Sequence, residues 1–107
     1  METETQKENK VVAWEILKQL GGNRFIAMTG AKNFLRDDNK QLIAFKIGRN
    51  SKSINHVRIT LNSMDTYDME FLMIRAGKIT IKSQAKGIYN DQLQDIFTEH
   101  TGLYTHL

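Results

Sequence analysis

The chain has no cysteine and no proline, and it has no long apolar run. The lack of cysteine excludes a disulfide framework and a thiolate metal site, and it fits a reducing cytoplasm. The lack of proline leaves the turns to Gly, Asn and Asp. No segment approaches the roughly eighteen consecutive apolar residues of a membrane-spanning helix, so we expect no membrane partner.

The residues that are present are those of a folded domain. The 107 residues are 40% apolar and 25% charged, as in a globular protein and unlike a disordered chain. This length leaves little room for a second core, so we expect one domain over residues 1–107, with about the first six residues frayed. The polar start, METETQKENK, is predicted to be neither a signal peptide nor a basic transit peptide.

Positive charge is concentrated in the middle of the chain. The net charge is +3, but the segment from Lys32 to Arg58 has seven basic residues against two acidic ones. The segment from Asp91 to Glu99 has three acidic residues and no basic one. A basic stretch of this kind makes nucleic acid a candidate partner.

Two segments have the apolar spacing of an amphipathic helix. The first ends at Gly21 or Gly22, and the sequence TQKE at Thr5–Glu8 has the form of a capping box. The second begins near Asn90 or Asp91 and ends at Gly102. Their apolar stripes are Val12, Ala13, Ile16, Leu17 and Leu20 in the first, and Leu93, Ile96, Phe97 and His100 in the second.

Between the two helices the apolar period changes to two, which predicts β-strands. RFIAM (Arg24–Met28) is predicted to be a short strand, TGAKN a turn, and FLRDDNKQ a second short strand that runs into a polar loop. KITIK adds Ile79 and Ile81 on one side of a late strand. The predicted inward residues of the other strands are Ile43, Phe45 and Ile47; Val57, Ile59 and Leu61; and Tyr67, Met69, Phe71 and Met73.

The connections between these strands are short and rich in turn-forming residues, which predicts antiparallel pairing. The expected fold is α+β: an antiparallel sheet of about five strands, flanked by an N-terminal and a C-terminal helix in two layers. Because the helices cover one face, the polar row His56, Arg58, Thr60 and Asn62 should lie on an open face.

The glycine-rich segment LGGNRFIAMTGAKNF, from Leu20 to Phe34, raises the question of a phosphate-binding loop. Such a loop needs G-x-x-x-x-G-K-[ST] between a strand and a helix, because backbone amides at the helix start hold the phosphates. Here Lys32 is followed by Asn33, which lacks the hydroxyl that a magnesium ion needs, and a dinucleotide G-x-G-x-x-G pattern is absent. We therefore expect turns at these glycines and no nucleotide cofactor.

Four segments together carry a resemblance: GGNRFIAMTGAKNF, VRITLN, DTYDMEF and IFTEHTGLYTHL. They resemble a group of small proteins from phages and mobile elements of gut bacteria, and the likeness extends over nearly the whole chain. The resemblance implies an accessory protein that acts in the cytoplasm of a bacterial host, where such proteins handle DNA or oppose host defences. It assigns no activity to particular residues.

The candidate binding residues are basic or titratable side chains on the expected open face and in the loop beside it: Lys46, Arg49, Lys52, His56 and Arg58. Basic and aromatic groups on such a face bind single-stranded nucleic acid. However, Phe45, Tyr67 and Phe71 are predicted to point inward, where bases cannot stack on them. Asp68 and Glu70 are placed to pair with Arg58 and Lys46 across the strands. A solvated face with ion pairs is thus the simpler interpretation.

The sequence does not predict an enzyme or a metal site. The serines expected in loops and turns show no nucleophile-elbow motif: Ser51, Ser53, Ser63 and Ser83. The acidic residues Asp65, Asp68 and Glu70 are more simply explained as the solvent-exposed side of a strand. His100 and His106 are six residues apart with Asp95 and Glu99 nearby, but this spacing fits no metal site.

Two hypotheses for the function follow. The first is a non-enzymatic phage or mobile-element protein that binds a host protein through the open face or an edge strand, with counter-defence as one role. The second is a nucleic-acid-binding module that uses the basic stretch from Lys32 to Arg58. Some apolar residues are expected to lie outside the core, which indicates that part of the surface is covered by a protein partner or by a second copy in a homodimer. These residues are Trp14, Met64, Leu72 and Ile74.

Overall fold

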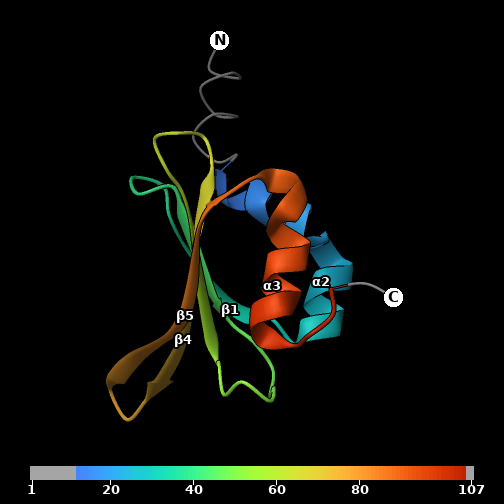
Figure 1. Cartoon of the computed structure of the whole chain (residues 1–107), viewed down its shortest axis with the longest axis vertical. Helices are drawn as coiled ribbons and strands as arrows, with labels where there is room; N and C mark the ends of the chain where they lie inside the picture. Colours follow the sequence, from blue (N-terminus) through green and yellow to red (C-terminus); the bar gives the residue numbers. More distant parts are fainter. Residues whose placement is uncertain (1–11, 106–107) are drawn as a thin grey trace.

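The computed structural model describes residues 12–105 of the chain. Residues 12–20 are helical, and a second short helix follows directly. Figure 1 shows the path of the chain. The elements are α2 (Gly22–Thr29), β1 (Lys32–Asp37), β2 (Leu42–Lys46), β3 (His56–Leu61), β4 (Tyr67–Arg75), β5 (Lys78–Ile88), the 3-10 turn η1 (Asn90–Gln92) and α3 (Leu93–Thr101).

The five strands form one sheet in the order β1-β2-β3-β4-β5, and each strand pairs antiparallel with the next in the chain. The helices lie on one side of this sheet and leave its other side uncovered (Figure 1). The predicted α+β class, the antiparallel sheet and the two-layer arrangement are confirmed.

The first helix ends where the sequence predicted. Gly21 has a positive φ of 126°, and its N–H donates to the carbonyl oxygens of Leu17 and Lys18 at 3.2 and 3.1 Å. A residue without a Cβ is favoured at such a φ, and the bonds satisfy carbonyls that the ending helix leaves free. The expected capping box at Thr5–Glu8 and the fraying of residues 1–6 lie outside the described residues.

The predicted strand at Arg24–Met28 is wrong, because these residues form most of helix α2. Its buried residues, Phe25 and Thr29, are four apart and so lie on one helical face, and Gly30 ends the helix with a left-handed φ of 70°. Both Gly21 and Gly22 have positive φ, which turns the chain sharply enough for a second helix to begin at once. An apolar run this short has no periodicity that separates a strand from a buried helix.

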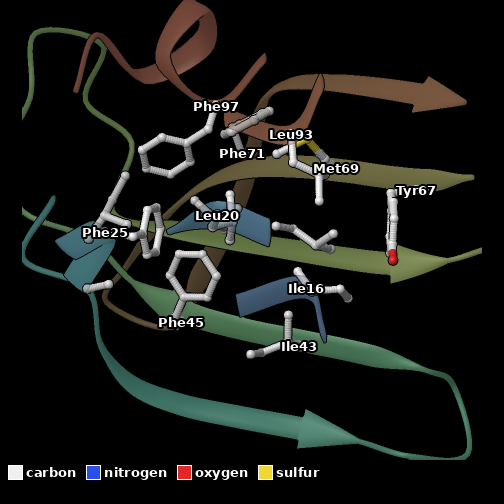
Figure 2. Close-up of a cluster of buried hydrophobic side chains, with 14 of the residues drawn as sticks. Ile16, Leu20, Phe25, Ile43, Phe45, Tyr67, Met69, Phe71, Leu93 and Phe97 are labelled. Atoms are coloured by element: carbon white, nitrogen blue, oxygen red, sulfur yellow. The ribbon is translucent and has the colours of Figure 1, made fainter. Parts of the chain in front are cut away.

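The core lies between the sheet and the helical layer (Figure 2). The ring of Phe25 from α2 lies between two other rings in this core, with ring centroids 5.6 Å from Phe45 on β2 and 5.1 Å from Phe97 on α3, both edge-to-face. Aromatic pairs favour this geometry because the positive ring edge meets the negative ring face. Predicted inward residues confirmed as buried are Ile43, Phe45, Ile47, Val57, Ile59, Tyr67, Met69 and Phe71.

The last strand departs from regular alternation at two places. Phe71 pairs with Ser83, but Leu72 pairs with Ile81, so Lys82 is an extra residue in β5. Such a bulge reverses the alternation of faces, so the residues before it point to the opposite side from the one that regular pairing would give. Ile79 and Ile81 therefore lie on the open face, opposite Ile74 and Leu72, while Ser83 lies on the helix side.

Candidate functional site

The open face carries the polar row that the sequence predicted. In the register of the sheet, His56 is opposite Lys46 and Leu72, Arg58 is opposite Ala44 and Glu70, and Thr60 is opposite Leu42 and Asp68. Each member of the row is partly exposed, whereas their neighbours Val57 and Ile59 are fully buried on the helix side. No helix covers this row among residues 12–105, so the polar row lies on an open face as the sequence predicted.

The open face also carries an apolar patch, which the sequence only hinted at. Its members surround the polar row on both sides, and we call them the open-face patch: Leu35, Ala44, Leu72, Ile74, Ile79 and Ile81. Leu35, Ile79 and Ile81 are 66%, 56% and 50% exposed, whereas Leu72 is buried, with 2% exposed. Most of the patch lines one hollow of about 390 Å³, which His56 and Arg58 also line. Apolar area gathered in a concave surface is typical of a binding site.

Arg58 is held by its neighbour on the next strand. Its Nη2 lies 2.6 Å from Glu70 Oε1, and its Nε donates to the same oxygen at 2.8 Å. This confirms the cross-strand pair expected for Arg58 and Glu70; no ion pair of Lys46 is found in the described part of the chain. Both side chains are partly exposed, so the pair contributes only about 0.2–1 kcal/mol to stability. Its main effect is to neutralise the charge of Arg58 on this face.

His56 lies between the hollow and the loop before β3. Its Nδ1 is 2.8 Å from Asn55 Oδ1. Burial lowers the pKa of His56 below its ordinary value of 6.5, and the positive charge of Lys46 lowers the pKa further. The imidazole is therefore neutral at pH 7, and it can accept a hydrogen bond rather than attract an anion.

This shift makes stability depend on pH. Well above pH 6.5 the histidine is neutral in both states, so it has no effect; as pH falls toward and below that value, the unfolded chain takes up a proton before the folded chain does. We expect the free energy of unfolding to fall between about pH 7 and pH 5.5, and His56→Gln to flatten this decline. Urea unfolding of both proteins across this range measures it. An equal slope in the two proteins would contradict the effect.

Arg49 and Lys52 are not on the open face. They lie in the loop between β2 and β3, where the structure places them beside basic residues of the β4–β5 hairpin that the sequence analysis did not single out. Arg49 and Arg75 line one hollow, and Lys52 and Lys82 line another. The five predicted site residues are thus divided between two surfaces: Lys46, His56 and Arg58 on the open face, Arg49 and Lys52 at one end of the sheet.

A serine–histidine contact on the helix side was also missed. The Ser83 hydroxyl forms a hydrogen bond with His100 Nδ1, and the His100 ring is stacked on Phe71 with centroids 4.7 Å apart and planes at 2°. Within residues 12–105, no carboxylate bonds to the imidazole to orient it as in a hydrolytic triad. The contact therefore fixes α3 on the sheet, and the stacking explains why this histidine belongs to the apolar stripe.

A second apolar hollow lies at the β1 edge. The hollow has a volume of about 340 Å³ and is lined by Trp14, Ile26 and Phe34, among others. The guanidinium of Arg36 is 5.8 Å from the centre of the Trp14 ring. Trp14 is 54% exposed, in agreement with its predicted position off the core stripe. This hollow lies beside the helical layer, and it adjoins the hollow of the open face because Leu35 and Arg36 line both.

The described residues form neither a metal-binding group nor a membrane-spanning helix. Across 12–105, no three His, Asp or Glu side chains are grouped to hold a metal ion, and His106 lies outside that range. The helices of the described chain include none with the length and apolarity to cross a membrane. No protein-family model matches the chain, and no curated protein or solved structure matches it either.

Proposed function

We propose that the protein is a non-enzymatic binding protein, and that it binds an apolar segment of a host protein on the open face of its sheet. In this proposal it is an accessory protein of a phage or mobile element that acts in the host cytoplasm, with inhibition of a host defence as one outcome. The open-face patch supports the proposal best, because two of its side chains that are more than half exposed, Leu35 on β1 and Ile79 on β5, line a concave surface.

The composition of the open face favours protein over nucleic acid there. Ile79 and Ile81 offer apolar area that a protein segment can bury, at roughly 25 cal/mol per Å². Arg58 is paired with Glu70, and in the register of strands β1 to β5 this face carries no Phe, Tyr or Trp ring on which a base could stack. The polar groups around the patch would form the rim that protein interfaces have.

The test is a comparison of two double variants in a nuclease-treated lysate of a gut bacterium. Ile79→Lys/Ile81→Lys places two charges in the patch, and Met64→Lys/Tyr104→Lys adds the same charge at residues that are 80% and 68% exposed elsewhere. We expect the parent and the control to retain the same proteins, identified by mass spectrometry, and the patch variant to retain at least about tenfold less, because an unpaired charge is costly to bury.

Two results would contradict the proposal. One is that no protein is retained reproducibly by the parent chain. The other is that the patch variant retains its partners as well as the control does. Thermal unfolding of both variants shows whether either change affects the fold.

A further inference from the structure

Two chain segments that are distant in sequence meet at one end of the sheet. Consecutive strands are antiparallel neighbours, so the β2–β3 loop and the β4–β5 turn fall at the same end, as Figure 1 shows. The hairpin extends past the start of β3, because His56 at that start pairs with Leu72. Residues 73–80 therefore form a two-stranded ribbon that continues past β3.

This end is strongly positive. Residues 49–55 and 73–83 contain five basic residues and no acidic one, and we call them the basic end: Arg49, Lys52, Arg75, Lys78 and Lys82. The opposite end lacks this excess of positive charge, since the β1–β2 and β3–β4 connections carry Asp38 and Asp65 against Lys40, and Asp37 and Asp68 lie in the adjoining strand ends. Charge of one sign concentrated at one end attracts a partner of the other sign and orients it.

The basic side chains line three hollows, and Arg75 lines two of them. Arg49 and Arg75 line a hollow of about 410 Å³, and Arg75 and Lys78 line a second hollow of the same volume on the hairpin. Lys52 and Lys82 line a third one. Glu99 is the one carboxylate among the described residues that line these hollows.

Two asparagines hold the loop and the hairpin in place. Asn55 Nδ2 donates to the carbonyl oxygen of Ile74 at 2.9 Å, and its Oδ1 accepts from the Ile74 N–H at 2.8 Å, which joins the loop to β4. Within the loop, Asn50 donates to the carbonyl oxygens of Gly48 and Ile54 and accepts from the Lys52 N–H. The charges therefore sit on a pre-formed surface, and binding has less conformational entropy to lose.

We propose that the basic end binds the phosphate backbone of duplex DNA. Residues 49–55 and 73–83 contain no Phe, Trp or Tyr, so the end lacks the stacking platform on which single strands depend. A two-stranded ribbon fits the major groove of B-form DNA, whereas the major groove of an RNA helix is too narrow for it. Binding through Lys and Arg alone is independent of base sequence. This site does not depend on the proposed open-face partner.

The experiment measures fluorescence anisotropy of a labelled 20-base-pair DNA of arbitrary sequence against the full chain, from about 50 to 200 mM NaCl. Each neutralised phosphate contributes about −0.9 to the slope of log K against log salt, so three to five contacts give roughly −3 to −5. Arg49→Ala/Arg75→Ala/Lys78→Ala should make the slope shallower by between about two and three, and should weaken binding at least about tenfold at 50 mM.

The matched control is Lys18→Ala/Arg24→Ala/Lys40→Ala, which removes the same charge from exposed residues outside the basic end. It should keep the slope of the parent chain. The proposal is overturned if the parent shows no salt-dependent binding, if the control loses as much as the basic-end variant, or if a single strand of the same length binds more tightly than the duplex. Circular dichroism confirms that the variants fold, since all six residues are exposed.

Discussion

Replacing Phe25 with alanine should destabilise the protein by about 3–5 kcal/mol, which is the range for removing a buried phenylalanine. The ring is 0% exposed and contacts Phe45 from the sheet and Phe97 from α3, so its loss leaves a cavity where three elements meet. This is a large part of the stability of a domain of this size, which is typically about 5–15 kcal/mol.

Urea unfolding at pH 7 measures the effect, with Arg24→Ala as the control. Arg24 is the preceding residue in α2 and is exposed, so its replacement should change the free energy of unfolding by less than about 0.5 kcal/mol. A loss below about 1 kcal/mol for Phe25→Ala would show that the ring is not at the centre of the core, and it would contradict the packing of α2.

Replacing Asn55 with alanine should cost about 2–3 kcal/mol. The side chain both donates to and accepts from the backbone of Ile74, and its loss leaves a partly buried N–H and C=O without these partners. An unsatisfied buried group costs about 1–3 kcal/mol, whereas an ordinary hydrogen bond contributes about 1 kcal/mol. The backbone bond from the Asn55 N–H to Leu72 remains, so the sheet itself should persist.

Amide hydrogen exchange locates this effect. The Ile74 N–H should exchange faster in Asn55→Ala, while amides of β2 and β3 in the centre of the sheet should change only with global stability. Asn39→Ala is the control, because Asn39 is exposed in the β1–β2 turn and no side-chain hydrogen bond of it is found. Unchanged protection at Ile74 would mean that Asn55 does not hold the hairpin.

Much of the fold could be predicted because the physical signals were strong and local. The alternation from Ile43 to Ile47 and from Val57 to Ile59 indicates strands with one buried face. The apolar residues at every second position of these two segments are buried, as expected. Glycines at the expected helix ends have the positive φ that such ends favour, as at Gly21 and Gly102. One open sheet face was predicted because two amphipathic helices are enough to cover only one side of the sheet.

The errors arose where local patterns were ambiguous. Arg24–Met28 is apolar over too few residues to show a period, and only the contacts of Phe25 with β2 and α3 make it a helix. The bulge at Lys82 reverses the faces of Ile79 and Ile81, and no feature of the sequence KITIK predicts that the strand contains an extra residue. Tertiary pairing fixed both features.

The candidate site was predicted only in part for a related reason. The predicted group consisted of basic residues that are near one another in the chain, from Lys32 to Arg58. The sheet instead places Arg49 beside Arg75 and Lys52 beside Lys82, because alternate connections of an antiparallel meander fall at the same end. This grouping could have been deduced from the expected strand order, by comparing the connections two apart instead of adjacent residues.

The sequential strand order also has a consequence for folding kinetics. Every strand pair joins neighbours in the chain, so each closes a short loop and the sheet can grow by local steps. The helical layer is different: Gln94 of α3 donates to the carbonyl oxygen of Leu20, 74 residues away. Docking of the two chain ends across this distance is thus the step with the greatest entropic cost, and mutations there should slow the folding rate most if that contact belongs to the transition state.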